Sequence, residues 1–184
     1  GGMEALQRGL SMVNPLIPAE LPCWVWWNGP LDEAPDVFEG ISQAPRRLII
    51  DTAIGTPARS LDVLSQRAAA GQAISDLNWY RLSSWRENLA MVFDHPGRRD
   101  ALAHVVQLDI DVQGHQPVQG LLMAAWIANR LGWSLESSNH CDGDGISASF
   151  RRPDGVAVQF RQMPVPVGEP STHPGSIVGL RLVC

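Results

Sequence analysis

The 184-residue sequence contains no lysine, and all 14 of its basic residues are arginines. Its 19 acidic residues outnumber them, so the net charge is −5 at pH 7. Proteins that bind nucleic acid need a basic patch, whereas the arginine pairs of this sequence are isolated from one another. The charge balance therefore predicts that nucleic acid is not a partner.

The sequence also lacks a long apolar run and any cysteine pattern that would bind a metal. Its longest apolar run, Leu121–Ala128, is too short to cross a bilayer. No basic segment followed by an apolar segment resembles a secretory signal, so we expect a cytoplasmic protein without a membrane partner. Cys23, Cys141 and Cys184 form no CxxC pair, which favours free thiols over a metal site.

The acidic residues give weak catalytic signals. Asp109 and Asp111 share one strand face and could do acid–base chemistry, but the local sequence places no histidine beside them. Residues 141–145, CDGDG, begin like a calcium loop but lack its later ligands, so a hairpin connection is the better interpretation. Asp51 ends an apolar strand without a glycine-rich phosphate loop. We therefore predict no catalytic residues, metal or cofactor.

The apolar and turn patterns predict a mixed α/β fold. Strands are expected at residues 23–27, 47–52, 106–112 and 177–184, a β-hairpin at 146–161, and helices at 37–42, 61–70, 84–93, 98–104 and 118–131, the last of them between Pro117 and Gly132. The expected architecture is a mixed sheet with two main helices packed on it and a C-terminal β-hairpin extension. We expect a single domain at residues 13–184, part of a longer protein, after a lead-in or added segment at residues 1–12.

Residues 76–93, DLNWYRLSSWRENLAMVF, gather aromatic and arginine side chains. Tryptophan and arginine are frequent anchors of protein–protein contacts. We therefore predict that Trp79, Arg81 and Arg86 bind a partner. An alternative use of these arginines is an anion or nucleotide site formed by Asp51, Arg81 and Arg86.

The same stretch predicts how its helix begins. Ser84 and Glu87 have the spacing of a capping box, and Trp85 is expected to face the core. In the earlier strand, Trp24 and Trp26 are expected to share one face, opposite Trp27. Core packing is the preferred interpretation for most of the seven tryptophans.

Four segments also resemble a known family. They are LPCWVWWNGP at 21–30, RRLIIDTA at 46–53, DLNWYRLSSWRENLAMVFD at 76–94 and LLMAAWIANRLGW at 121–133. In this order and spacing they resemble the OpcA family of glucose-6-phosphate dehydrogenase assembly proteins, although Asn28, Thr52 and Ser83 depart from its usual residues. The resemblance covers about residues 13–135 and leads us to expect the C-terminal α/β part of the family without its N-terminal domain.

The resemblance implies a non-enzymatic protein that binds glucose-6-phosphate dehydrogenase and promotes its assembly or allosteric activation. This activity would serve the oxidative pentose phosphate pathway. The resemblance also implies thioredoxin as a further partner, without identifying a redox-active cysteine. The rival prediction from the residues alone is a small-ligand or nucleotide-binding α/β domain that uses Asp51, Arg81 and Arg86.

Overall fold

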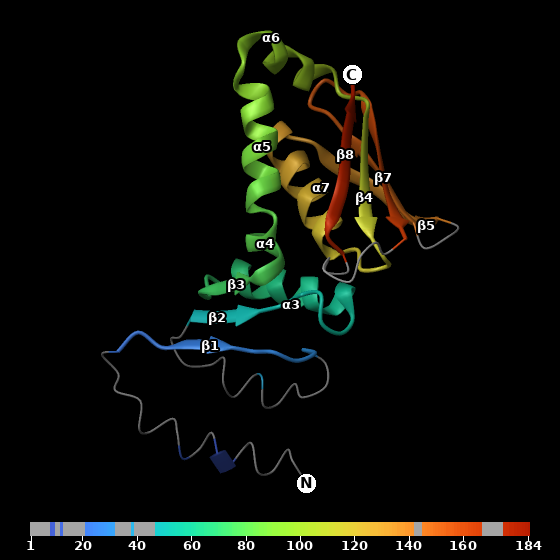
Figure 1. Ribbon diagram of the computed structural model, residues 1–184. Coiled ribbons are helices and arrows are strands. Elements are labelled where there is room, and N and C mark those ends of the chain that lie inside the picture. Colours follow the sequence, from blue (N-terminus) through green and yellow to red (C-terminus); the bar gives the residue numbers. More distant parts are fainter. Residues whose placement is uncertain are drawn as a thin grey trace. The chain divides into compact units, whose positions relative to one another are not determined.

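The computed structural model describes residues 8–9, 12, 21–31, 38, 47–141, 145–166 and 175–184. Contacts within the chain divide it into two compact units, residues 1–80 and 81–184 (Figure 1). The predicted α/β class is confirmed, and the described strands form two sheets. The single domain at 13–184 stays a prediction. Most of the expected lead-in at 1–12 and of the helix at 37–42 lies outside the described residues.

The first unit contains a small parallel sheet. Its elements are β1 (Trp24–Trp26), β2 (Arg47–Ile50), α3 (Pro57–Ala69), β3 (Ile74–Asp76) and the start of α4 (Leu77–Arg81). The strand order is β1-β2-β3, and both strand pairs are parallel. Helix α3 covers one face of this sheet, where Val63 and Leu64 pack against the buried Leu48 and Ile50.

Helix α3 begins one turn earlier than the sequence predicts. Pro57 occupies its first turn, because the fixed φ of proline suits this position and its missing N–H is not needed there. Ser60, which directly precedes the predicted helix and has a side chain suited to capping it, lies inside the observed helix, where its hydroxyl donates a hydrogen bond to the Ile54 carbonyl at 3.3 Å. Gly71 follows the helix with φ of 74°, as expected for a glycine stop.

The second unit contains a mixed five-stranded sheet. Its elements are α5 (Ser83–Asp94), α6 (Pro96–Arg99), the 3₁₀ helix η2 (Asp100–His104), β4 (Gln107–Gln113), α7 (Val118–Leu131), β5 (Ser134–Cys141), β6 (Gly145–Arg151), β7 (Ala157–Val165) and β8 (Ile177–Val183). The strand order is β5-β6-β7-β4-β8, in which only β4 and β7 are parallel. The predicted hairpin is therefore part of this sheet.

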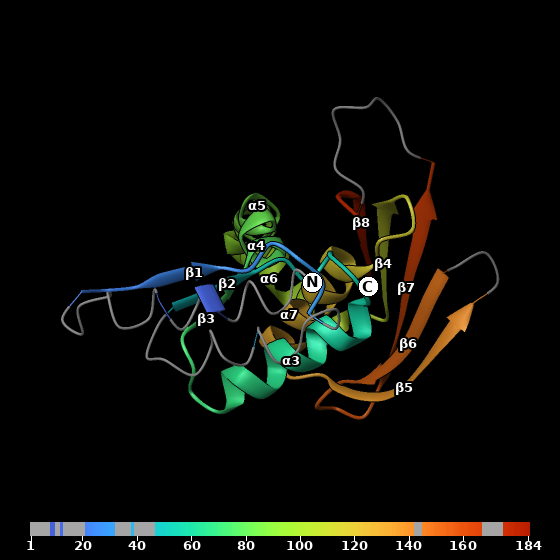
Figure 2. The same ribbon diagram turned by 90° about the horizontal axis from the view of Figure 1, so that it is seen from below.

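Helix α7 lies on one face of the five-stranded sheet and closes the main core (Figure 2). Met123 and Ile127 of α7 share this core with Leu108, Ile110 and Phe160 of the sheet. The predicted bounds of α7 are confirmed, with Pro117 before it and Gly132 after it at φ of 69°. Both signals act locally on the backbone, which explains why sequence alone located them.

The predicted capping box is wrong. No side-chain hydrogen bond caps the start of α5, and Ser84 lies inside the helix. The chain is already helical in α4, so the Leu82 carbonyl accepts from the Arg86 amide at 3.0 Å. Trp85 packs against the core as predicted, whereas Val92 of the same helix is 44% exposed.

Candidate functional site

Four polar side chains join the carboxyl ends of β2 and β3 in the first unit. We call Asp51, Thr52, Asp76 and Asn78 the β2–β3 polar network. Asp76 accepts hydrogen bonds from the Thr52 hydroxyl at 2.8 Å, the Thr52 amide at 3.1 Å and the Asn78 amide at 3.2 Å. The Asn78 side-chain amide donates to Asp51 at 2.8 Å and to the Thr52 hydroxyl at 3.1 Å.

Asp76 is only 2% exposed, and burial raises the pKa of its carboxyl group. The hydrogen bonds from Thr52 and Asn78 oppose this shift, and the nearby charge of Asp51 adds to it. Both Asp76 oxygens already accept hydrogen bonds from the protein. This arrangement favours a structural role, in which the network fixes the ends of the two strands.

The predicted site residues are divided between the units. Asp51 and Trp79 belong to the first unit, and Arg81 and Arg86 belong to the second. Arg81 is exposed, and the Arg86 guanidinium donates to the Ser83 hydroxyl at 3.2 Å. One Asp51 oxygen accepts from Asn78 and from the Ala53 amide at 3.0 Å. The anion site of Asp51, Arg81 and Arg86 stays a prediction, as does the partner-binding role of Trp79 and the two arginines.

Asp109 is the corresponding buried acid of the second unit. Burial alone would raise its pKa, but hydrogen bonds from Arg161 and Gln107 and the charges of Arg161 and Arg181 lower it overall. The nearest guanidinium nitrogens lie 3.0 Å away in Arg161 and 3.6 Å away in Arg181. The Asp109 carboxylate is therefore held in its charged form by ion pairs, which is typical of structural roles and unfavourable for accepting a proton.

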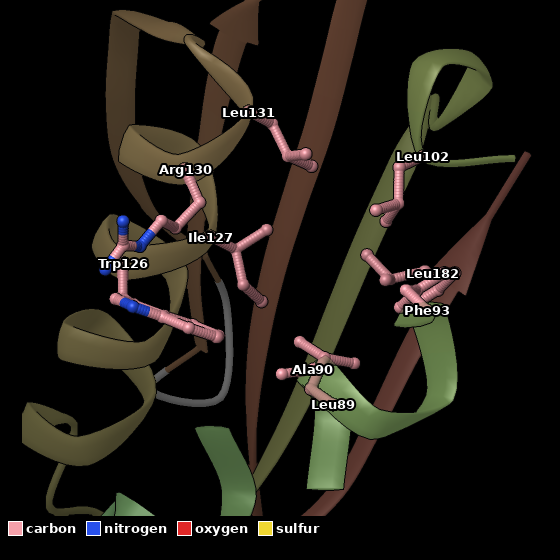
Figure 3. A pocket seen from close by; sticks show the side chains of 9 residues that line it. All are labelled: Leu89, Ala90, Phe93, Leu102, Trp126, Ile127, Arg130, Leu131 and Leu182. Atoms are coloured by element: carbon pink, nitrogen blue, oxygen red, sulfur yellow. The ribbon is translucent and has the colours of Figure 1, made fainter. Parts of the chain in front are cut away.

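An apolar pocket of about 90 Å³ lies between α5, η2, α7 and β8 (Figure 3). Its lining residues are Leu89, Ala90, Phe93, Leu102, Trp126, Ile127, Arg130, Leu131 and Leu182. Arg130 is the one charged residue of this lining, so the pocket offers space for a small apolar group and no acid–base pair for catalysis.

A larger groove of about 440 Å³ follows α7 on the side of β5 and β6. Its wall includes Leu121, Trp133 and Ile146, together with Leu135, which is 60% exposed. The groove lacks any titratable side chain among its lining residues. Its chemistry is therefore that of an apolar surface.

The sheet of the first unit carries exposed tryptophans on the face opposite α3. Trp24 and Trp26 are 61% and 63% exposed, so these two residues lie outside the core packing that the sequence favours for most of the tryptophans. The Arg47 guanidinium lies 5.1 Å from the centre of the Trp24 ring, and Ile49 pairs with Trp26 across the strands. We call Trp24, Trp26, Arg47 and Ile49 the indole face.

The neighbouring tryptophan has the opposite environment. Trp27 points to the other side of the strand, as predicted, and packs edge-on against Phe38 at 5.4 Å between ring centres. The alternation of the WVW segment thus identified which side chains share a face. It carried no signal for which face is covered, because both faces present large apolar residues.

Groups that could hold a metal ion are absent from the residues that the structure describes, where no three His, Cys, Asp or Glu side chains come together. In the same part of the chain, Cys23 and Cys184 are free thiols. None of the described helices is long and apolar enough to span a membrane.

Comparison with protein families gives two matches in order along the chain. Residues 1–66 match the model described as glucose-6-phosphate dehydrogenase subunit N-terminal domain, and residues 72–178 match the corresponding C-terminal domain. The predicted family is therefore confirmed. The expectation that the N-terminal domain is missing must be corrected, because residues 1–66 match it.

Curated relatives agree with these matches. A protein of Synechococcus elongatus, named as a candidate OxPP cycle protein OpcA, is 34% identical over 188 residues, covering 98% of this chain and 40% of the relative. A protein of the same name from Nostoc punctiforme is 32% identical over 185 residues, covering 99% and 40%. The chain thus spans about 40% of the length of these relatives.

Solved structures resemble the chain in fold. An oxidoreductase from Sinorhizobium meliloti aligns with a TM-score of 0.52 at 13% identity, covering 89% of this chain and 51% of that one. A candidate oxidoreductase from Erwinia carotovora atroseptica aligns with a TM-score of 0.50 at 13% identity, covering 88% and 56%. At such low identity the likeness concerns the fold alone.

Proposed function

Because this chain belongs to the OpcA family, we propose that it is a non-enzymatic protein that binds glucose-6-phosphate dehydrogenase and promotes its assembly or allosteric activation. One observation carries this proposal. Two family models, each described as a domain of a glucose-6-phosphate dehydrogenase subunit, match the chain in order over residues 1–66 and 72–178. The function therefore concerns this dehydrogenase and the oxidative pentose phosphate pathway.

The geometry of the buried acids supports a role without chemistry. Asp76 accepts hydrogen bonds within the β2–β3 polar network, and Asp109 is paired with arginines. A binding protein needs no reactive group of its own. If it prefers the active oligomer of the dehydrogenase, its differential affinity shifts the population toward that oligomer.

We retain Trp79, Arg81 and Arg86 as proposed contacts with the dehydrogenase. Arg81 is exposed and Trp79 is half-buried, so at least one of these side chains is accessible for a partner. Thioredoxin remains a proposed second partner, and a cytoplasmic location remains part of the proposal. Free thiols at Cys23 and Cys184 are compatible with redox regulation.

The test uses the full natural protein and the glucose-6-phosphate dehydrogenase of the same organism. Purified dehydrogenase should bind the protein in a pull-down and should show a higher specific activity or a larger fraction of its active oligomer. The protein alone should not oxidise glucose 6-phosphate. Absence of binding by the full natural protein would contradict the proposal.

The ligand-binding alternative has a separate test. The hydrogen bonds of Asp51 to Asn78 and Ala53 favour a structural use of this carboxylate. We therefore expect calorimetric titration with inorganic phosphate, NADP or ATP to show no saturable binding. Saturable binding that Arg81→Ala and Arg86→Ala both weaken would support the nucleotide or anion site instead.

A further inference from the structure

We propose that the indole face of the first unit is the surface on which glucose-6-phosphate dehydrogenase docks. This inference rests on the proposed function and adds the place and chemistry of the contact. The surface consists of Trp24, Trp26, Arg47 and Ile49, and it differs from the contacts predicted at Trp79, Arg81 and Arg86.

The first step of the argument is the exposure of two large apolar side chains side by side. Trp24 and Trp26 are 61% and 63% exposed and alternate on one strand, so their indole rings lie on the same face. Tryptophan contributes disproportionately to protein–protein contacts when a partner buries it. Two such side chains on three consecutive residues form an apolar patch that water solvates poorly.

The second step is the kind of sheet that carries them. An all-parallel sheet is normally covered on both faces. Here α3 covers one face through Val63 and Leu64, and the opposite face presents the two indoles. Among the described residues of this unit, no helix packs on the indole face, so this face is the one that a partner with an apolar surface would cover.

The third step concerns charge. Arg47 is the charged side chain among the strand positions of this face, and its guanidinium lies 5.1 Å from the Trp24 ring centre. When a guanidinium stacks on an indole ring, the N–H groups at its edge can still donate hydrogen bonds to a carboxylate. The partner surface should therefore combine apolar side chains, which cover the indoles, with an acidic residue opposite Arg47.

Charge also argues against two copies of this chain as the pair. A two-fold contact through this face would bury the Arg47 side chains of both copies in one interface. The strand positions of the indole face offer no carboxylate to balance these charges. A different protein that supplies the carboxylate fits the surface better.

The sequence comparison favours glucose-6-phosphate dehydrogenase as that protein. The whole indole face lies within residues 1–66, which match the family model described as glucose-6-phosphate dehydrogenase subunit N-terminal domain. The net charge of −5 disfavours nucleic acid and acidic membrane surfaces as occupants. The dehydrogenase is thus the partner that the family match and the chemistry of the face favour together.

The main experiment measures the dissociation constant of the complex between the full natural protein and the dehydrogenase. We expect Trp24→Ser with Trp26→Ser to weaken binding by about 30-fold or more, which is typical of hot-spot residues. Arg47→Glu should weaken it by about tenfold, because it places like charges opposite each other. The matched control, Met91→Ser with Leu135→Ser, removes two side chains that are 71% and 60% exposed in the second unit, and it should change binding less than twofold.

The outcomes separate this inference from the proposed function. If the wild-type protein binds and the double tryptophan variant binds within threefold of it, the docking surface lies elsewhere while the proposed function stands. If the wild-type protein does not bind, both are wrong. Circular dichroism checks that each variant is folded.

A second measurement avoids dependence on the double variant. A photo-reactive benzoylphenylalanine at position 26 should crosslink to the dehydrogenase, whereas the same group at position 91 should not. Crosslinking from position 26 only to a second copy of the chain would overturn the inference in favour of self-association. Equal crosslinking to the dehydrogenase from both positions would overturn it as well.

Discussion

The two units of this chain each bury an aspartate, and they stabilise it by different means. In the first unit, Asp76 accepts hydrogen bonds from the neutral groups of Thr52 and Asn78. In the second unit, Asp109 is paired with Arg161 and Arg181. The pKa of Asp76 is raised by burial, whereas that of Asp109 is lowered once the arginines outweigh burial.

This difference shows that satisfying the hydrogen bonds of a buried carboxylate is not the same as balancing its charge. At Asp76, neutral donors satisfy the hydrogen-bonding capacity of the carboxyl group. The cost of burying its negative charge is still the larger effect, so the pKa is raised. At Asp109, the arginines contribute a hydrogen bond to the carboxylate and also balance its negative charge, so the pKa is lowered. The units also differ in their surfaces. The exposed strand face of the first unit is aromatic, whereas the sheet of the second unit presents Arg161 and Arg181 to solvent around Asp109.

The largest expected effect comes from the core of the second unit. Phe160→Ala should lower the free energy of unfolding by about 3–5 kcal/mol, because it leaves a cavity beside a side chain that is buried between sheet and helix. Hydrogen exchange should rise in β4, β6 and β7 more than in β2. Gln159→Ala, at the exposed neighbouring position, is the control. An equal rise in both units would show one cooperative domain, as the sequence predicted, and would remove the distinction between the units.

The next effect concerns the β2–β3 polar network. Asp76→Ala should cost about 3 kcal/mol, because buried donors of Thr52 and Asn78 lose their acceptor. Chemical denaturation measures this change. Asp62→Ala is the matched control, since Asp62 is exposed and accepts a hydrogen bond only from Gln66 at 2.9 Å among the bonds that the structure describes for it. Similar losses in the two variants would contradict a structural role for the network.

The opposite pKa shifts predict opposite dependences on pH. Protonated Asp76 stabilises the folded state; this contribution is complete below the ordinary aspartate pKa and is lost as pH rises through the raised pKa. Ionised Asp109 contributes stability above the ordinary pKa, and that contribution is lost as pH falls through the lowered pKa.

Denaturation of the wild type, Asp76→Asn and Asp109→Asn over a range of acidic pH measures both dependences. The stability difference between the wild type and Asp76→Asn should become less favourable to the wild type as pH rises. As pH rises, the stability difference between the wild type and Asp109→Asn should become more favourable to the wild type. Slopes of the same sign would contradict the contrast between the two buried acids.

The smallest effects are expected at the arginines around Asp109. Arg161→Ala should cost about 1 kcal/mol and Arg181→Ala about 0.5 kcal/mol, because both side chains are largely exposed and Arg161 lies closer. Urea denaturation at low and high salt should show both losses shrinking as salt rises. A larger loss for Arg181→Ala would reverse the assigned order of the two ion pairs.

Local signals explain most of what the sequence predicted correctly. Pro117 and Gly132 delimit α7, and the turn at residues 152–155 joins β6 to β7, with Gly155 at φ of 86°. Each signal constrains a few neighbouring backbone angles, so it acts without knowledge of the rest of the fold.

The remaining features depend on residues far apart in the sequence. Thr52 and Asp76 are 24 positions apart, and no local pattern indicates that they meet. Strand β5 lacks the apolar alternation by which strands are recognised, and its sequence SLESSNHC is mostly polar. The capping-box prediction failed because α4 already supplies a helical turn before Ser84. For the indole face, alternation specified the pair of tryptophans but not their exposure.

The most direct test of the central claim is hydrogen exchange of the full natural protein with and without glucose-6-phosphate dehydrogenase. Binding should slow exchange in β1 and β2, around Trp24 and Arg47, and should leave β4 and β7 unchanged. Protection confined to residues 79–86 would favour the contacts predicted from sequence and contradict docking at the indole face. No protection anywhere in the chain, at dehydrogenase concentrations that saturate its other assays, would contradict the account as a whole.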